Sequence, residues 1–456
     1  MKIFALMVFT VSIVAFEARA QPANLSVQDA VGQALEKYPA VRGSLEQVSA
    51  AAASIGLART TYLPRADLLW QTNRATHNNV FGMALPQGIL PSMTGPVLGT
   101  DSLQSVWGTA VGALVQWEPF DFGLRRALVG VAESQREQAR AQVEVTKLQV
   151  GTAAADGFLT ILAAQETVVA AQSAVDRARV LHQTVQVLVN NQLRPGADAA
   201  RTRSELALAE TQLIRAQQSV DVSKAALSQL LGVTPQSIAV LPGPFLQLPP
   251  SDTPPAFDPS RHPQAIAQTQ EVNIVRARES TLDRSYYPRF LLQGTSFARG
   301  TGLRPNGSVG GAFSGTFPNT QNWGLAMTVT FPVFDFAAIR ERKKIETFNE
   351  RAATARYDQI VQDLTGQLEQ ARATLSAARR IAQNTPIQLD AARTSEQQAS
   401  ARYKAGLGNV IEVAEAQRIL AQAEIDDSLA RLTVWRALLA IAAASGNLQP
   451  FLDQAK

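Results

Sequence analysis

The side chains that could carry chemistry are few and far apart in this chain of 456 residues. There is no cysteine, and the three histidines, His77, His182 and His262, are widely separated. A metal site needs several donor side chains that converge, so we expect each histidine to be a surface or loop residue. The motifs of zinc proteases, serine hydrolases and phosphate-binding loops are also missing. The sequence therefore predicts neither an enzyme nor a metal or cofactor site.

Two groups of charged residues could act on a ligand. Glu412 and Glu415 are three residues apart, so they share one face of a helix, although acidic residues also simply suit a helix N-terminus. Basic residues gather at the starts of two predicted long helices, where the helix dipole disfavours cations: Arg125, Arg126, Arg340, Arg342, Lys343 and Lys344. Contact with lipid headgroups or solvation beside Glu341 and Glu346 would explain them. Because no basic block is longer than Arg342-Lys343-Lys344, nucleic acid is not an expected partner.

The N-terminus has the composition of a secretory signal peptide. The stretch MKIFALMVFTVSIVAFEARA places Lys2 before an apolar run and ends in the small-x-small site Ala18-Arg19-Ala20. We therefore expect residues 1–20 to be removed and the mature chain to begin at Gln21 outside the cytoplasm. No later stretch is predicted to cross a membrane as a helix. The mature protein is then either soluble in the periplasm or held in a membrane by β-strands.

The tripeptide FDF occurs twice, as PFDFG around Asp121 and as PVFDF around Asp335. When Asp121 is aligned with Asp335, the segments that follow the two FDF tripeptides match each other without gaps. Upstream of the junctions, the match continues when Pro64 is aligned with Pro288. A repeat of this length is one architectural unit written twice.

Each copy contains a long helical hairpin. Apolar residues recur at steps of three and four from Leu124 to about Asn190 without a proline. This predicts a helix of about 100 Å at 1.5 Å per residue. A turn at Gln192–Gly196 and a returning helix to about Leu231 complete the hairpin, at about residues 121–231.

The second copy repeats this pattern. Its hairpin spans about residues 335–445, with the turn at Ala405–Gly408. Further helices are predicted at about 40–61 and 264–285, ahead of the strands of each copy.

Between these helices the hydrophobic period drops to two, which predicts strand pairs at about 65–118 and 289–331. The clearest strand alternates small or polar residues with Trp323, Leu325, Met327, Val329 and Phe331. One apolar face with aromatic ends is typical of a transmembrane β-strand. A strand of a soluble sheet shows the same alternation, so the strand by itself leaves both interpretations open.

Prolines mark the four places where the chain crosses between strand and helix, because proline disfavours helix before it and donates nothing to a ladder. These are Pro64, Pro119, Pro288 and Pro332. Asp121 and Asp335 follow two of them and are predicted to be the N-caps of the long helices.

The predicted fold is a helix-dominated α+β membrane protein with an internal two-fold repeat. The first repeat spans residues 21–232, a proline-rich linker 233–263, the second repeat 264–446 and a C-terminal tail 447–456. Four strands per chain cannot close a barrel, and open sheet edges are not tolerated in lipid. Chains must therefore pool strands, two chains giving eight and three giving twelve.

The doubled module, the PFDFG and PVFDF junctions and the segment ARYKAGLGNVIEVAEAQ (Ala401–Gln417) resemble the TolC-type outer-membrane efflux family. The resemblance covers essentially the whole mature chain. It implies a homotrimer in the outer membrane, with a twelve-stranded barrel continuous with an α-helical tunnel across the periplasm. It also implies partners, namely a periplasmic adaptor protein and an inner-membrane transporter, besides outer-membrane lipid.

The function that the resemblance implies is a passive exit duct for small toxic compounds or drugs. The same duct could instead serve type I protein secretion or metal-ion efflux. A function of another class, a periplasmic coiled-coil adaptor or scaffold, fits less well, because an adaptor would have one hairpin rather than two hairpins with four amphipathic strands.

The resemblance also assigns roles to residues near the hairpin turns. It implies a periplasmic gate at which Glu412 and Glu415 form rings of carboxylates, while Asp198 and Tyr403 tie neighbouring helices shut. The arginine that accompanies them in the family is replaced here by Gly408. Docking of the adaptor or pump is implied for a second set of turn residues, Leu193, Leu407 and Gly406. The first turn carries Gln192 where the family has glycine.

Overall fold

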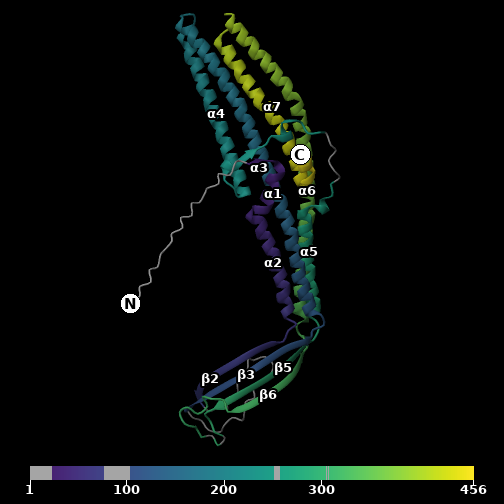
Figure 1. Cartoon of the computed structure of the whole chain (residues 1–456). Coiled ribbons are helices and arrows are strands. Elements are labelled where there is room, and N and C mark those ends of the chain that lie inside the picture. The colour runs from purple at the N-terminus through teal and green to yellow at the C-terminus, as the bar shows by residue number, and fades with distance from the viewer. Residues whose placement is uncertain (1–22, 77–102, 251–256, 305, 307) are drawn as a thin grey trace, which may run out of the picture. The chain divides into compact units, whose positions relative to one another are not determined.

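The computed structural model describes residues 23–76, 103–250, 257–304, 306 and 308–456 (Figure 1). The predicted signal peptide and its cleavage site lie outside the described residues, as does His77. In chain order the elements are β1 (Ala23–Leu25), α1 (Val27–Lys37), α2 (Pro39–Thr60), β2 (Arg65–Thr76), β3 (Ser105–Phe120), α3 (Leu124–Asn190), α4 (Gly196–Leu231), η1 (Pro235–Ser237), β4 (Ile238–Val240), η2 (Gly243–Leu246), η3 (Pro259–Arg261), α5 (Pro263–Arg284), β5 (Arg289–Thr301), β6 (Thr320–Thr330), α6 (Phe336–Lys404), α7 (Val410–Ala444) and α8 (Gln449–Gln454).

The chain divides into two compact units. Unit 1 consists of the residues up to Gly43 together with Glu144–Pro263 and Val361–Lys456. Unit 2 consists of Ser44–Val143 and Gln264–Ile360. The strands β2, β3, β5 and β6 belong to unit 2, whereas both hairpin turns belong to unit 1.

Unit 2 contains an antiparallel sheet with the strand order β2-β3-β5-β6 (Figure 1). The two copies of the repeat meet at its centre, where β3 pairs with β5. This leaves β2 and β6 as the two edges of the described sheet, so the sheet is open in a single chain.

The two faces of this sheet differ in polarity, as the period of two predicts. In the pairing register, Trp70 lies opposite Val111 and Ser296 lies opposite Trp323. One face exposes large apolar side chains, namely Leu68, Trp70, Val111, Val115, Trp117, Trp323, Leu325 and Met327. The other face carries mainly polar or small residues, including Asp67, Gln71, Gln293, Thr295 and Thr328.

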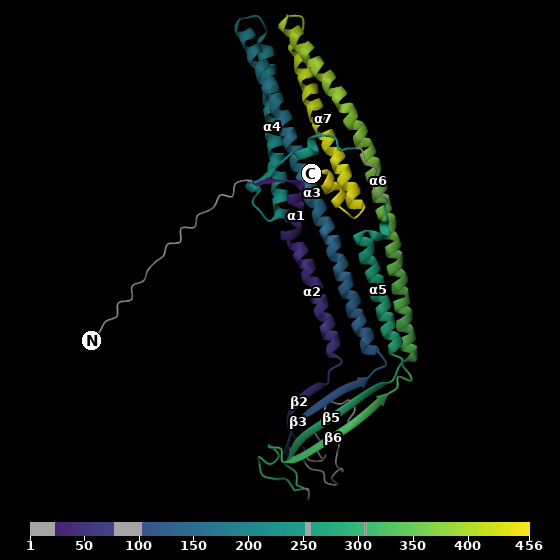
Figure 2. The ribbon, with the colours of Figure 1, turned by 45° about the vertical axis from the view of Figure 1, so that its right-hand side comes forward.

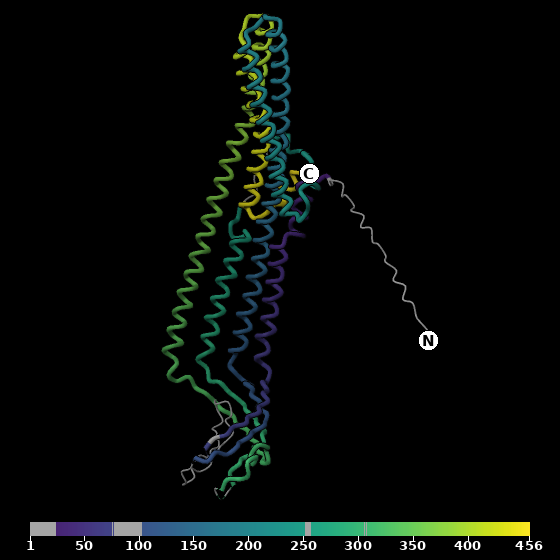
Figure 3. The backbone as a smooth tube through the Cα atoms, turned by 90° about the vertical axis from the view of Figure 1, so that its left-hand side faces the viewer, coloured from purple at the N-terminus to yellow at the C-terminus, as the bar shows by residue number. Residues whose placement is uncertain are grey.

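The helices of unit 2 are joined by both apolar and polar contacts. α2 runs beside the start of α3, and α5 runs beside the start of α6 (Figure 3). A small apolar cluster of Ile55, Val129 and Ala132 packs α2 on α3. Arg276 on α5 binds Glu350 on α6 at 2.6 Å.

In unit 1, α3 with α4 and α6 with α7 form two antiparallel hairpins whose turns lie at the same end of the unit (Figures 1 and 2). α3 spans the residues that the helical periodicity predicts. α3 also contains an 18-residue stretch that is apolar enough to cross a membrane by length and composition, contrary to our expectation. This stretch is 44% buried, because α3 supplies a large share of the unit 1 core.

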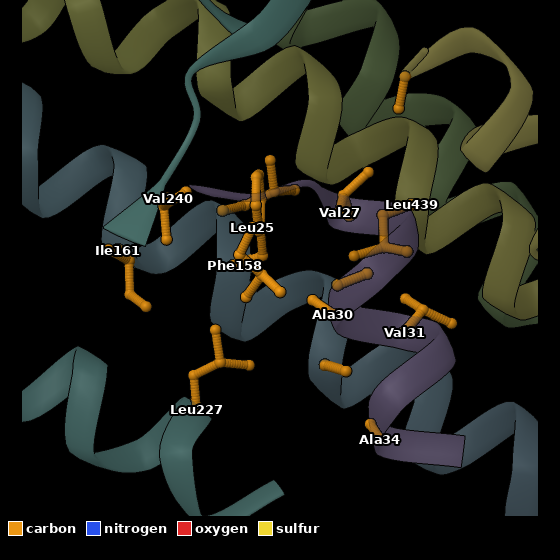
Figure 4. Packing of buried hydrophobic residues seen from close by; sticks show 14 of the residues in the cluster. Leu25, Val27, Ala30, Val31, Ala34, Phe158, Ile161, Leu227, Val240 and Leu439 are labelled. Atoms are coloured by element: carbon orange, nitrogen blue, oxygen red, sulfur yellow. The ribbon is translucent and has the colours of Figure 1, made fainter. Parts of the chain in front are cut away.

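That core lies away from the hairpin turns. It joins the middle of α3 to α1, to the end of α4 and to the end of α7, with Phe158, Leu227 and Leu439 among its residues (Figure 4). Helix α1 was not predicted from the sequence, although Ser26 and Asp29 form a capping box at its start. The parallel pairing of β1 with β4 was not predicted either. β4 gives the proline-rich linker a fixed contact within unit 1.

The junctions between strand and helix differ between the two copies. Asp121 accepts hydrogen bonds from the backbone N–H groups of Gly123 and Arg125, and its carboxylate pairs with the Arg125 guanidinium at 2.6 Å. Its side chain therefore caps α3, although two residues ahead of the N-cap position. Asp335 occupies the N-cap position of α6, where its carbonyl accepts a hydrogen bond from the Ile339 N–H at 2.8 Å, but its side chain is exposed and makes no capping hydrogen bond in the described structure.

The junction prolines stand at the ends of the strands. Pro64 and Pro288 immediately precede β2 and β5, Pro119 is the penultimate residue of β3, and Pro332 is the second residue after β6.

Candidate functional site: the hairpin turns of unit 1

The two hairpin turns have the same backbone design. The N–H of Leu193 bonds to the Leu188 carbonyl at 2.9 Å, and the N–H of Leu407 bonds to the Arg402 carbonyl at 2.9 Å. Each bond spans six residues and ends its helix, α3 or α6, in a Schellman motif, which requires a residue in the left-handed conformation directly before the leucine. Gly406 fills that position in the second turn with φ of 75°, and Gln192 fills it in the first with φ of 59°.

Both turn leucines project into solvent. Leu193 is 68% exposed and Leu407 is 73% exposed. The shared turn geometry therefore presents one large apolar side chain at equivalent places on the two hairpins.

Glu412 takes part in a cap at the start of α7. The Asn409 side chain accepts a hydrogen bond from the Glu412 N–H at 2.9 Å and donates one to the Glu412 carboxylate at 3.2 Å. Glu412 therefore acts as a helix-end acid within the chain, while its side chain stays exposed.

Glu415 is paired with a cation, Arg418, that was not predicted from the sequence. Arg418 binds both of its carboxylate oxygens, at 2.6 and 3.0 Å. This hydrogen bonding and the arginine charge lower the pKa of Glu415. A basic residue three positions after an acidic one on a helix is the signal that could have found the pair.

Tyr403 is buried although it lies one residue before the end of α6. Only 4% of its surface is exposed, and it packs among Leu181, Val185, Val410 and Val413. The guanidinium carbon of Arg194 lies 5.0 Å from the centre of its ring. Burial raises the pKa of Tyr403, opposed by the charge of Arg194 and reinforced by that of Asp198.

The hydrogen bond predicted between Asp198 and Tyr403 is not formed within the chain. The Tyr403 hydroxyl is buried and has no hydrogen-bond partner among the described residues. A buried hydroxyl without an acceptor is costly, so this group is an unfilled donor of the single chain.

Two clefts open beside these residues in unit 1. One of about 190 Å³ lies among α3, α4 and α7 and is lined by Thr202, Glu205 and Arg418. The other, of about 590 Å³, lies among α3, α6 and α7 and is lined by Arg177 and Tyr403.

The two described histidines are structural rather than a site. His182 Nδ1 lies 3.0 Å from the Thr202 hydroxyl and links α3 to α4. His262 was expected at the surface but is buried beside α7, with Nε2 3.3 Å from the Ala443 carbonyl. The described residues contain no group of three or more side chains placed to hold a metal ion.

Comparison with known proteins agrees with this architecture. The sequence profile of the family described as Outer membrane efflux protein matches residues 30–233 and 261–447, which is most of the chain. The two matched segments correspond to the two copies of the repeat. The resemblance to TolC-type channels is thereby confirmed.

Individual relatives are more distant. Protein CyaE of Bordetella pertussis is 27% identical over 469 residues, covering 95% of this chain and 89% of that protein. The cobalt-zinc-cadmium resistance protein CzcC of Cupriavidus metallidurans is 28% identical over 314 residues, covering 66% of this chain and 69% of that protein. The Campylobacter jejuni CmeC outer membrane channel has a similar fold, with a TM-score of 0.70 at 16% identity, covering 94% of this chain and 89% of that one.

The family is one of transport ducts rather than enzymes. The profile match, the doubled helical hairpin and the sheet with an exposed apolar face lead to one assignment. The chain belongs to the outer membrane efflux protein family and is an efflux channel of the outer membrane that extends into the periplasm.

Proposed function

We propose that three copies of the chain pool their strands into one twelve-stranded barrel in the outer membrane. The observation that carries this proposal is the open sheet of unit 2, whose edges are β2 and β6 and whose exposed face is apolar. Lipid tolerates no unpaired backbone edge, so each β6 must pair with β2 of another chain.

The length of the apolar face suits a membrane. Trp323 of β6 and Phe331, the residue directly after β6, are eight residues apart with the same place in the alternation. At about 3.4 Å per residue they are separated by roughly 27 Å along the strand. A strand tilt of about 40° reduces this to roughly 21 Å across the membrane, within a few ångströms of the apolar band of about 25 Å around an outer-membrane barrel. Outer-membrane lipid is therefore the proposed partner of this face.

Cysteine crosslinking tests the assembly, because the chain has no cysteine of its own. Each variant would carry two cysteines, one at Thr72 of β2 and one on β6. The position on β6 would be Gln321, Trp323 or Leu325, and each variant would be oxidised in membranes. A covalent trimer on denaturing gels is the expected result. A ladder that stops at the dimer indicates the eight-stranded alternative, and the absence of any crosslinked species contradicts strand pooling.

The cargo that we propose is a small toxic compound or drug, delivered by a periplasmic adaptor and an inner-membrane transporter. Metal-ion efflux is the second candidate, because CzcC, a relative, is a cobalt-zinc-cadmium resistance protein. Deletion of this gene, with growth scored on drugs and on cobalt, zinc and cadmium salts, separates the two. Sensitivity to drugs alone supports the first candidate, and sensitivity to the metals alone supports the second.

Adaptor docking is proposed at the turns, through Leu193, Leu407 and the left-handed Gly406. The matched exposure of the two leucines on equivalent turns supports this assignment. Replacing both leucines by Asp should abolish export while leaving the trimer and its membrane yield intact. Unchanged export would remove the docking role.

The periplasmic gate is proposed to lie beside the same turns. The Tyr403 hydroxyl is buried without a partner among the described residues, and we propose Asp198, whose charge acts on Tyr403, as the acceptor that ties the neighbouring helices together. In a trimer Glu412 and Glu415 would supply six carboxylates, partly neutralised by Arg418. In planar bilayers, Glu412→Gln with Glu415→Gln should reduce cation selectivity, and Tyr403→Phe should raise the resting conductance. Wild-type selectivity in the double variant would remove the carboxylates from the pore.

A further inference from the structure

The segment that enters β6, residues 308–319, is folded back onto the sheet of unit 2. The Thr316 carbonyl accepts a hydrogen bond from the Thr109 hydroxyl of β3 at 2.9 Å. The Asn319 N–H donates to the Arg299 carbonyl of β5 at 2.9 Å. The segment therefore contacts both central strands, at the end of the sheet that is remote from the helices of unit 2 (Figure 1).

The face that this segment covers is the apolar face of the sheet, which exposes Trp70 and Val111. Thr109 lies two residues before Val111 on β3, so both side chains point to this face. Gly300 pairs directly with Thr109, and a side-chain carbon at Gly300 would collide with the Phe317 carbonyl. Contacts on two strands thus place the backbone of the segment on the apolar face, where it leaves Thr109 only 4% exposed.

The same segment leaves two large aromatic side chains uncovered. Phe313 is 82% exposed and Phe317 is 83% exposed. The backbone that carries them is fixed by Thr316, whose N–H and hydroxyl donate to the Phe313 carbonyl at 3.3 and 2.7 Å. Apolar area that a folded chain holds in place without burying it marks a surface for a partner.

A cation and an indole mark the outer limit of the apolar face. Arg74 pairs directly with Trp107 across β2 and β3, and its guanidinium carbon lies 5.4 Å from the centre of a Trp107 ring. Both lie on the apolar face, two residues or roughly 7 Å beyond the level of Thr109. A cation on a lipid-facing strand costs little only near the membrane surface, where tryptophan is also enriched. This pair therefore indicates the headgroup level, with residues 315–317 just inside it.

The loop that joins β5 to β6 has a composition that suits this level. Residues 302–319 contain Arg304 and no acidic residue. Arg304 is exposed, and so is Arg74. Cations at the membrane surface attract anionic headgroups. Irregular backbone is not tolerated among acyl chains, so the loop belongs at the boundary between headgroups and acyl chains.

We propose that residues 308–319 form a membrane-anchoring flap whose partner is the anionic lipid of the outer leaflet. Phe313 and Phe317 insert between the acyl chains, and Arg74 and Arg304 bind the lipid phosphate groups. This rests on the proposed barrel, which places the apolar face in lipid and this end of the sheet at the cell exterior. The flap fixes the depth of the barrel rim in the membrane, and Gly300 allows it to lie flat on β5.

Fluorescence quenching in phosphatidylcholine vesicles measures the depth of the flap. Because the chain has no cysteine, the full-length protein can carry one labelled cysteine at Phe317, at Asn306 in the loop tip or at Leu325 on β6. A nitroxide near the headgroup end of the acyl chain should quench the Phe317 label at least about twofold more than one at the chain terminus, since interfacial groups lie about 5–10 Å deep. The Leu325 label should be quenched by both nitroxides and the Asn306 label by neither. A Phe317 label quenched no more than the Asn306 label overturns the flap.

Two glycines of β5 provide a matched pair of variants. Gly294 and Gly300 point to the same face, but a side-chain carbon at Gly294 would meet only Leu325, at 3.9 Å. In the protein labelled at Phe317, Gly300→Ala should displace the flap and lower the quenching at least about threefold, whereas Gly294→Ala should not change it. The Leu325 label should keep its quenching in Gly300→Ala, because the sheet stays in the membrane. Equal quenching of the Phe317 label in the two glycine variants overturns the placement of the flap on β5.

The lipid class is tested with phosphatidylglycerol and phosphatidylcholine that carry the same nitroxide. At equal mole fraction, phosphatidylglycerol should quench the Phe317 label about fivefold more strongly, the enrichment expected from one cation near an anionic surface. The ratio should fall toward one in Arg74→Gln with Arg304→Gln. A ratio near one in the protein with both arginines overturns the anionic lipid as the partner.

The Leu325 label separates this inference from the barrel proposal. If the Leu325 label is quenched and the Phe317 label is not, the flap is wrong and the barrel stands. If neither label is quenched, the apolar face does not meet lipid, and both ideas fail.

Discussion

Removal of the Asp121 carboxylate should destabilise the start of α3 far more than the equivalent change destabilises α6. Asp121 and Arg125 form an ion pair whose side chains are only 9% and 7% exposed. In Asp121→Ala the guanidinium of Arg125 keeps two contacts, the Thr61 carbonyl at 3.1 Å and the Tyr62 ring at 4.7 Å. Neither contact neutralises its charge, so the variant leaves a buried cation without a counter-ion.

The magnitude follows from this environment. Breaking a buried pair by removing one partner costs about 3–5 kcal/mol. The two remaining contacts of Arg125 place the loss near the lower limit, at about 3 kcal/mol. The backbone N–H groups of Gly123 and Arg125 also lose their acceptor, a cap worth about 1 kcal/mol. Replacing both members in Asp121→Asn with Arg125→Met should recover most of the loss, since no buried charge then remains.

Hydrogen exchange of the assembled protein, followed by mass spectrometry, measures this local stability. The combined loss of about 4 kcal/mol corresponds to roughly a thousandfold faster exchange in the first turns of α3. Asp335 is the internal control, because it occupies the matching place in the repeat but is exposed and makes no side-chain hydrogen bond. Asp335→Ala should change exchange at the start of α6 by less than threefold. Equal effects at the two junctions would show that the buried Asp121–Arg125 ion pair does not stabilise the start of α3.

Three further changes have defined outcomes. Gln192→Gly should stabilise the first turn by up to about 1 kcal/mol, because a non-glycine residue in the left-handed conformation costs about 1–2 kcal/mol and the equivalent residue of the second turn is Gly406. The gain should appear as slower hydrogen exchange in the first turn. Faster exchange would show that Gln192 is not strained. Burial lowers the pKa of His262 in the folded state, so just below pH 6.5 the unfolded state binds more protons than the folded state. The free energy of unfolding should therefore fall as the pH drops from 6.5 through the lowered pKa. His262→Asn should remove this pH dependence from the unfolding curves, and an unchanged curve would contradict the prediction. Asp427 on α7 accepts a hydrogen bond from the buried Thr385 hydroxyl on α6 at 3.0 Å and pairs with Arg431. Asp427→Ala should therefore destabilise unit 1 by about 2 kcal/mol in denaturant titration, because both groups lose their acceptor. A loss below about 0.5 kcal/mol would show that these contacts do not stabilise unit 1.

Much of the local structure followed from periodic patterns. A helix or strand with one apolar and one polar face repeats its apolar residues at a fixed spacing, which the sequence shows directly. The steps of three and four residues along α3 and the alternation along β6 are examples. The hairpin turns were also predictable, because a glycine at position 406 and a proline at position 195 interrupt long helical runs. Elements without such a pattern escaped. β1 and β4 are three residues each, which is too short for alternation to show.

The candidate site was predicted less well than the helices that carry it. Its residues could be named, but their partners could not. Glu415 was expected to belong to a ring of carboxylates, and its pairing with Arg418 was not predicted. Tyr403 was expected to bond Asp198 and has no acceptor within the chain. A sequence places residues on a face of a helix, whereas the partner of a side chain depends on its rotamer and on the neighbouring helices.

The sequence by itself determined the doubled module, the two hairpins, the amphipathic strands and the family, because each is a property of local order or of repetition along the chain. Only the tertiary structure decided how the two copies diverge. Asp121 is clamped by a buried arginine where Asp335 is exposed, and Glu424 pairs across the hairpins where Glu210 pairs within its own. The physical reason is that burial sets the strength of an ion pair. Burial is a property of packing between segments that are far apart in the sequence.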